Sequence, residues 1–230
     1  MDRGYVFRMT QSLPPPARQR ITALNPRWWD YNHHYVPAKL RTDPVYAAVL
    51  VELAGSALPV LDIGCGIGLL AFYLRESGLT ADITGCDYDA PKIACAQRMA
   101  AQGSYAGLSF SVGDARTGLP EFSGNVVILD ILQFFTRTEQ ETLLRAAAAR
   151  VAVGGKLIIR SCLRDDSTRF RITVAGDWLA KLTFWMKDAP VCYPDHDLFE
   201  SVLTAAGLRV QISPLWGGTP FNNHLIVAAR

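Results

Sequence analysis

The stretch Val60-Leu61-Asp62-Ile63-Gly64-Cys65-Gly66-Ile67-Gly68 decides the fold. Its first residues predict a buried strand, and its glycines predict a turn that leads into a helix from Leu69. Such a turn lets a ligand approach the backbone and face the helix N-terminus. Because many strand-to-helix turns carry glycines for packing alone, the loop by itself does not establish a binding site.

Outward from this stretch, predicted strands and helices alternate to the end of the chain. The strands are expected at 59–63, 82–87, 108–112, 125–132, 156–161, 208–212 and 223–228, and the helices at 43–53, 69–77, 91–102, 139–150 and 197–206. Asp43 is the expected N-cap of the first of these helices. The alternation implies βαβ units with right-handed crossovers and a mostly parallel sheet.

Composition excludes several classes of protein. Half of the 230 residues are hydrophobic and 19% are charged, which excludes a disordered chain. The net charge of +2 argues against binding nucleic acid through bulk charge. Five cysteines without a CxxC pair predict neither a disulfide framework nor a metal site. With no signal-like stretch and no run of about 18 apolar residues, we expect a cytoplasmic protein without a membrane span.

Three acids follow three successive predicted strands. Asp62 ends the first strand, Asp87 closes the next, and Asp114 follows the third. The carboxyl ends of parallel strands share one edge of the sheet, so these acids are expected at one rim. They suit a ligand with a cationic group, a ribose diol and a base that carries a donor. S-adenosylmethionine has all three features.

These motifs resemble those of the class I S-adenosylmethionine-dependent methyltransferases. The resemblance covers residues 43–161 and 197–228, and is carried by VLDIGCGIGLLAFYL at 60–74, ITGCDYDAPKIACAQ at 83–97, VGDA at 112–115, VVILDILQFF at 126–135 and GGKLIIRS at 154–161. It implies an α/β fold: a Rossmann-like, doubly wound sheet of seven strands, mostly parallel, with the last strand antiparallel.

The same resemblance implies a set of cofactor-binding residues. Asp62 and the loop of Gly64, Cys65 and Gly66 would line the methionine end of the cofactor. Asp87 would bind the ribose hydroxyls, with Tyr88 beside the adenine. The remaining members of the predicted site are Asp114 and Ala115 at the adenine amine, and Asp130 and Gln133 over the sulfonium end.

The sequence departs from the family at Gln133, where many small-molecule members carry histidine. A glutamine cannot act as a general base at neutral pH, so a base must lie elsewhere or be unnecessary. His33 and His34 are the candidates, because histidine titrates near neutrality and this part of the fold often builds a lid. In the alternative interpretation, Trp28 and Trp29 pack the extension onto the domain and both histidines face water.

Two regions fall outside the alternating pattern. Residues 1–42 are expected to form an N-terminal extension or lid, beginning with a loose tail, before a methyltransferase domain at 43–230. An insertion at 163–194 is the expected acceptor-side cap. Its arginines could bind an anion or pair with Asp165 and Asp166. The apolar stripe that starts at Trp178 could be packing, an acceptor lid, a dimer seam or a membrane-touching face.

The function expected from these features is methyl transfer from S-adenosylmethionine to a small, largely apolar or aromatic acceptor, by O-methylation in secondary metabolism. The insertion and flanking segments resemble methyltransferases of bacterial aryl-polyene and related pigment assembly, whose acceptors can be tethered to a carrier protein. The alternatives are a nicotinamide-dependent oxidoreductase, disfavoured because GxGxxG spacing is missing, and a non-catalytic partner protein. No motif of nucleobase methylation follows the fourth strand, so no nucleic-acid partner is expected. The oligomeric state stays open, with a homodimer among the options.

Overall fold

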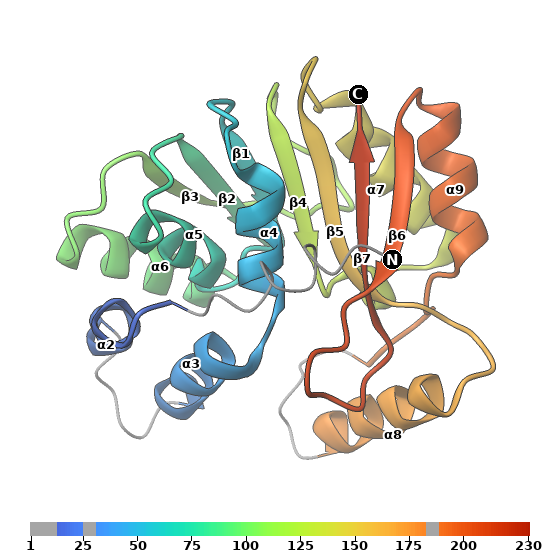
Figure 1. Ribbon diagram of the computed structural model, residues 1–230, viewed down its shortest axis with the longest axis horizontal. Coiled ribbons are helices and arrows are strands. Elements are labelled where there is room, and N and C mark those ends of the chain that lie inside the picture. The colour runs from blue at the N-terminus through green and yellow to red at the C-terminus, as the bar shows by residue number, and fades with distance from the viewer. Residues whose placement is uncertain (1–12, 25–30, 183–188) are drawn as a thin grey trace. The chain divides into compact units, whose positions relative to one another are not determined.

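The computed structural model describes residues 13–24, 31–182 and 189–230, and for residues 31–35 and 177–182 it describes the backbone alone. The chain forms two compact units, Met1–Asp114 and Ala115–Arg230. Figure 1 shows the course of the chain through its helices and strands.

The predicted sheet is confirmed. It has seven strands in the order β3-β2-β1-β4-β5-β7-β6. Pairing is parallel between β1, β2 and β3 and between β4 and β5, whereas β7 runs antiparallel to both β5 and β6. The strands are β1 Val60–Ile63, β2 Ile83–Asp87, β3 Leu108–Val112, β4 Asn125–Leu129, β5 Lys156–Cys162, β6 Arg209–Pro214 and β7 Asn223–Ala229.

The five expected helices are present, with bounds that shift by a few residues, whereas the helices at 15–23 and 31–42 were not expected. The helices are α2 Pro15–Ala23, α3 Tyr31–Thr42, α4 Val45–Leu53, α5 Leu69–Glu76, α6 Ala90–Gln102, α7 Arg137–Ala149, α8 Thr168–Leu182 and α9 His196–Ala205, with a 3-10 turn η1 at Leu132–Phe134. The N-cap of α4 is Pro44 and not the expected Asp43, although the Asp43 carboxylate accepts a hydrogen bond from the Val45 N–H.

In the first unit, the glycine loop joins a fully buried strand to a fully buried helix start. All four residues of β1 are buried, and α5 is buried from Leu69 to Leu74. Gly68 lies between them with a φ of 77°, and a Cβ at this position would come within 2.7 Å of the Phe110 ring on β3. Glycine is therefore required here both for the backbone conformation and for the close approach of α5 to β3.

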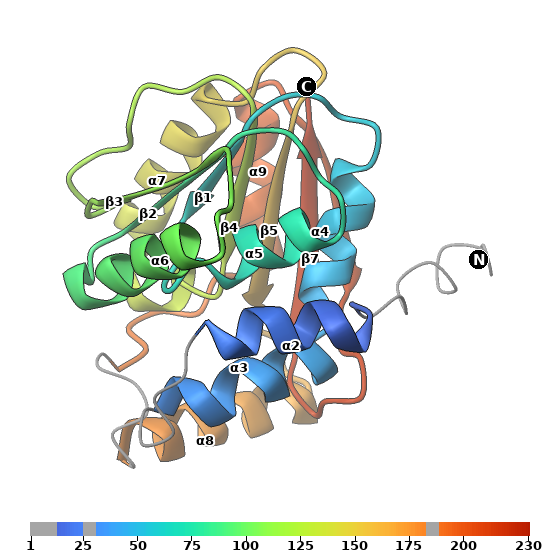
Figure 2. The ribbon, with the colours of Figure 1, turned by 90° about the vertical axis from the view of Figure 1, so that its left-hand side faces the viewer.

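The prediction of a loose tail over about the first 20 residues is wrong from residue 13 onward. Leu13, Ala17 and Ile21 are buried, and α2 lies beside α3 (Figure 2). Arg20 of α2 forms an ion pair with Glu76 at the end of α5. These three residues, at positions i, i+4 and i+8, form a narrow buried stripe that starts just before α2, and the prolines at 14–16 obscure it in the sequence.

In the second unit, the strand expected at 125–132 ends earlier, at Leu129. Asp130 has a φ of 59°, a left-handed conformation that stops the strand. The chain then forms η1 and enters α7 through a capping box, in which Thr136 and Glu139 each bond the other's backbone N–H. None of the helices in the described ranges combines the length and apolar character that crossing a membrane requires.

Candidate functional site

The glycine loop turns directly over the end of β2. The N–H groups of Gly64 and Cys65 both donate to the Cys86 carbonyl, at 2.8 and 3.0 Å. Gly64 and Gly66 have φ values of 75° and 57°, and a Cβ at Gly66 would meet no atom within 4 Å. The backbone at Gly66 therefore borders open space, as a loop that admits a ligand to its main chain should.

Asp87 fixes this loop from the end of β2. One carboxylate oxygen accepts the Gly66 N–H and the other accepts the Asp89 N–H, both at 2.9 Å. Each carboxylate oxygen can accept more than one hydrogen bond, so Asp87 can still receive a ribose diol. Its side chain is buried, at 6% exposure, which strengthens such bonds.

Asp89 is a residue that the sequence reasoning missed. It is buried and caps α6 by accepting the Lys92 N–H, while its own N–H holds Asp87. The signal was present as an aspartate two residues before a proline at a helix start. Asp89 thus couples the start of α6 to the orientation of the predicted ribose ligand.

Asp62 is the most desolvated acid of the rim. It is 2% exposed at the end of β1, opposite Gly85 of β2. Burial, together with the nearby charge of Asp87, raises the pKa of Asp62 to about 7. An acid whose ionised form is disfavoured by burial and by a second acid is suited to a positively charged ligand group. A methionine ammonium is such a group.

Cys65 is not a nucleophile. Burial and the two neighbouring acids raise the pKa of its thiol far above the usual range, and burial raises the pKa of Cys86 to about 11. A Cβ on Gly85 would lie 2.8 Å from the Cys65 sulfur, so the cysteine fills the space that Gly85 leaves.

Two exposed side chains flank the acids. Tyr88 follows Asp87 and is 47% exposed, and Val112, which pairs with Asp87 across the sheet, is 58% exposed. Exposed apolar groups beside an acid that is predicted to bind a ribose diol suit the faces of an adenine ring. Asp114 is half-buried two residues beyond Val112. The first unit thus gathers Asp62, Gly64, Cys65, Gly66, Asp87 and Tyr88 at the ends of β1 and β2, with Asp114 just after β3.

The other predicted residues belong to the second unit. Ala115 is its first residue, and Asp130 and Gln133 follow β4. Asp130 forms a two-point ion pair with Arg160 of β5. Both carboxylate oxygens of Asp130 thus accept hydrogen bonds from the Arg160 guanidinium. That Asp130 lines the cofactor stays a prediction.

Gln133 lies in η1 and is held on two sides. Its Nε2 donates to the Asp130 carbonyl at 3.0 Å, and its main-chain carbonyl accepts the N–H groups of Val191 and Cys192 at 2.7 and 3.2 Å. Its Oε1 is buried and has no hydrogen-bond partner among the residues that the structure describes. A buried, unsatisfied acceptor is costly and suits a ligand that donates a hydrogen bond.

The predicted base lies largely outside the described residues. His33 and His34 fall in α3, where only the backbone is described, and Trp28 and Trp29 lie in a range outside the description. The same holds for the side chain of Trp178 in α8. A histidine base and an aromatic lid therefore stay predictions.

The insertion is attached to the loop between β6 and β7, beside which α8 begins (Figure 1). Arg169 donates to the Thr219 carbonyl at 2.7 Å and stacks on Trp216 at 4.4 Å. The buried Thr173 accepts the Asn222 N–H at 2.9 Å. The arginines expected to bind an anion or pair with Asp165 and Asp166 are Arg160, Arg164, Arg169 and Arg171. Arg169 and Arg160, which is paired to Asp130, have partners other than those two aspartates. Their internal bonds weaken the anion-binding interpretation.

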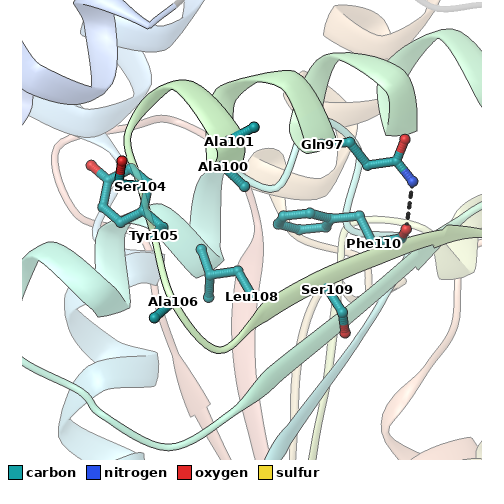
Figure 3. Close-up of a pocket in the computed structure, with 9 residues that line it drawn as sticks. All are labelled: Gln97, Ala100, Ala101, Ser104, Tyr105, Ala106, Leu108, Ser109 and Phe110. Carbon is teal, nitrogen blue, oxygen red and sulfur yellow. Dashed lines mark hydrogen bonds between the residues drawn. The ribbon is translucent and has the colours of Figure 1, made fainter.

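A cavity of about 630 Å³ opens elsewhere, between α6 and the edge strand β3 (Figure 3). Small side chains line it, among them Ala100, Ala101 and Ala106. Gln97 reaches across from α6 and donates to the Phe110 carbonyl at 2.8 Å. None of the three rim acids lines this cavity.

In the described part of the chain, no group of three or more His, Cys, Asp and Glu side chains could hold a metal ion.

Comparisons with known proteins agree with this geometry. A family model described as a methyltransferase domain matches residues 60–155. The chain is 27% identical to the ubiquinone biosynthesis O-methyltransferase of Xanthomonas euvesicatoria pv. vesicatoria (strain 85-10) over 170 residues, which cover 71% of this chain and 67% of that protein.

Two solved structures share the fold. Magnesium protoporphyrin IX methyltransferase from Synechocystis PCC 6803, with bound S-adenosylhomocysteine, matches over 99% of both chains with a TM-score of 0.64 and 18% identity. An O-methyltransferase family 2 protein from Planctomyces limnophilus DSM 3776, in complex with apigenin, has a TM-score of 0.65 and 17% identity over 99% of this chain and 68% of that one.

These findings decide against the nicotinamide-dependent oxidoreductase and the non-catalytic partner that the sequence left open. They also agree with the buried acid Asp62 and the open glycine backbone at the ends of β1 and β2, which fit S-adenosylmethionine. The chain carries a methyltransferase domain at residues 60–155, and it is an S-adenosylmethionine-dependent methyltransferase with the class I fold.

Proposed function

We propose that this methyltransferase O-methylates a small phenolic acceptor. The observation that carries the proposal is the buried Oε1 of Gln133, which has no partner among the described residues and can accept a hydrogen bond from an acceptor hydroxyl. Two comparisons support the aromatic class, since one relative is named for ubiquinone biosynthesis and one structural neighbour was solved with apigenin.

The proposal assigns the cofactor to the acidic rim of the first unit. Asp62 would hold the methionine ammonium, and the open backbone at Gly66 would face the methionine end. Asp87 would receive the ribose hydroxyls, Tyr88 would cover the adenine, and Asp114 would take its amine. These roles rest on the burial of the two acids near the glycine loop and the exposure of Tyr88.

When bound, S-adenosylmethionine supplies an electrophilic methyl group on a sulfonium sulfur. The acceptor oxygen forms a bond to that carbon as the carbon–sulfur bond breaks, and the phenolic proton is lost to a base or to solvent. Gln133 orients the hydroxyl and does not take the proton, because a carboxamide is not a base at neutral pH. A phenol has a pKa near 10, so it needs only modest assistance, and His33 or His34 is the proposed base.

Methyl transfer from labelled S-adenosylmethionine tests the acceptor class. A panel of catechols, hydroxyflavones and quinols, each with its fully methoxylated analogue as matched control, should give product only with the hydroxyl compounds. Activity on amines or carboxylic acids, with none on any phenol, would contradict O-methylation of a phenol.

Two variants test Gln133 within that assay. Gln133→Leu removes the acceptor oxygen and should raise the KM for the phenol by about tenfold, the effect of one lost hydrogen bond, with cofactor affinity unchanged. Gln133→Glu keeps an oxygen at that position and should retain more activity than Gln133→Leu. Equal activity of the wild type and Gln133→Leu would remove Gln133 from the acceptor site.

The wider setting is part of the same proposal. We place the enzyme in the cytoplasm and in secondary metabolism, with residues 163–194 as the acceptor-side cap and a carrier-tethered acceptor as the second form of substrate. Comparison of a free hydroxybenzoic acid with its phosphopantetheine thioester tests whether the acceptor is tethered. A preference of at least tenfold for the thioester would assign the tethered form.

A further inference from the structure

The chain makes an unusual turn where β4 ends. Asp130 has a φ of 59°, in the left-handed region that residues with a Cβ rarely adopt. Its N–H donates to the Arg160 carbonyl on β5 at 3.1 Å, so the backbone is still attached to the neighbouring strand at this point. The strain is stored one residue after the strand, at the edge where ligands of parallel sheets bind.

The side chains of the same two residues form a second attachment. Arg160 Nε donates to Asp130 Oδ1 at 2.7 Å, and Arg160 Nη2 donates to Asp130 Oδ2. The Arg160 side chain is 5% exposed, whereas that of Asp130 is 32% exposed. A planar guanidinium fixes a carboxylate in both direction and distance. Together with the backbone bond, it attaches Asp130 to Arg160 at three points.

The turn passes this constraint to Gln133. The Asp130 carbonyl accepts the Gln133 Nε2 at 3.0 Å, so the orientation of the Asp130 peptide sets the orientation of the carboxamide. The Gln133 carbonyl in turn receives the N–H groups of Val191 and Cys192, where the insertion returns to the domain. A change in the Asp130 backbone would therefore shift both the carboxamide and residues 191–192.

We infer that Arg160 is a positioning residue for the methyl transfer: through Asp130 it holds residues 130–133 in the left-handed turn that presents Gln133 to the acceptor. The inference rests on the proposed function in that Gln133 is taken as the acceptor contact. Arg160 itself contacts neither substrate nor cofactor. Its buried charge is used to stabilise a backbone conformation and not to bind an anion.

Two double variants distinguish support of the left-handed turn from the alternative that Arg160 only neutralises the charge of Asp130. Asp130→Gly/Arg160→Met and Asp130→Ala/Arg160→Met both remove the ion pair and differ only by one Cβ. Glycine adopts a positive φ without support, whereas alanine disfavours it by a factor of about ten or more in population. Arg137→Met, which breaks the more exposed Arg137–Asp195 pair at 2.8 Å, is the matched control for losing an arginine ion pair in the same unit.

The measurement is amide hydrogen exchange at residues 130–135 and 191–192, with S-adenosylhomocysteine affinity measured in parallel. The alanine double variant should exchange about tenfold faster there than the glycine double variant, with cofactor affinities within threefold of each other, because both lack the Asp130 carboxylate. Arg137→Met should leave these amides unchanged.

Equal exchange in the two double variants would overturn the inference, because the Cβ would then not matter. Failure of both double variants to fold would also overturn it, since the pair would then support the core and not the turn. Hydrogen exchange needs no acceptor, so the result stands apart from the phenol panel. On a phenol that the wild type methylates, the glycine double variant should keep at least tenfold more activity than the alanine one.

Discussion

Cofactor binding should be coupled to the proton of Asp62. With a pKa of about 7 in the unliganded protein, Asp62 is about 10% ionised at pH 6.0 and about 75% ionised at pH 7.5. If the ligand ammonium binds the carboxylate form, S-adenosylhomocysteine should bind about eightfold more tightly at pH 7.5 than at pH 6.0. Isothermal titration calorimetry in phosphate and in Bis-Tris should show release of about 0.9 proton at pH 6.0.

The same proton changes stability in a defined direction. Because the folded-state pKa of Asp62 lies above its ordinary value of 3.8, the folded protein holds a proton between about pH 4 and pH 7 that the unfolded chain has lost. Stability of the unliganded protein should therefore fall as pH rises through that window, by at most about 4 kcal/mol from this group.

Asp62→Asn tests both consequences in one protein. It should raise the melting temperature of the unliganded protein at pH 7.5, remove this part of its pH dependence, and abolish measurable S-adenosylhomocysteine binding. The exposed Asp82, just before β2, provides the control, and Asp82→Asn should change neither property. A pH-independent affinity in the wild type, or tight binding by Asp62→Asn, would refute the reasoning.

Three further substitutions test the packing around the site. Gly68→Ala combines a left-handed φ with a Cβ 2.7 Å from the Phe110 ring, so urea unfolding should show a loss of about 2–4 kcal/mol, and a loss below 1 kcal/mol would contradict that geometry. Thr173→Val leaves the buried Asn222 N–H without its acceptor and should cost about 1–3 kcal/mol in urea, with faster tryptic cleavage in α8; unchanged cleavage would show that the bond does not fasten the helix. Ile21→Ala should cost about 2–5 kcal/mol, because its side chain is fully buried, whereas a loose N-terminal tail would tolerate it without loss.

The sheet was predictable because its signals are local. Val60–Ile63 is an apolar run that ends at glycines, and Asn125 to Leu129 is another, so each strand is visible without its partners. The rim acids were predictable for the same reason. Parallel strands put their carboxyl ends at one edge, so an acid after each strand has a fixed place in the fold.

The turn after β4 was not predictable, because its cause lies in another strand. Nothing within residues 125–132 shows that Asp130 will pair with Arg160, thirty positions along the chain, and adopt a positive φ. The strand was therefore expected to continue for three more residues. The buried Oε1 of Gln133, which has no partner in the part of the chain that the structure describes, follows from that turn and has no sequence signal of its own.

The N-terminal extension shows the same limit. Three prolines and few large apolar residues suggest a tail, yet α2 is held by Ile21 and by the bonds that Glu76 makes with Arg20 and Tyr105. These partners lie far along the chain. The local sequence correctly indicates a low helix propensity, but it does not show the tertiary contacts that stabilise the helix.

A crystal structure with S-adenosylhomocysteine tests the central claim most directly. The account predicts the ligand amino group within about 3 Å of Asp62, the ribose hydroxyls at the same distance from Asp87, and the Gly66 backbone alongside the amino-acid end. A ligand bound instead in the cavity between α6 and β3, or at the rim with Asp62 and Asp87 out of hydrogen-bond reach, would contradict it.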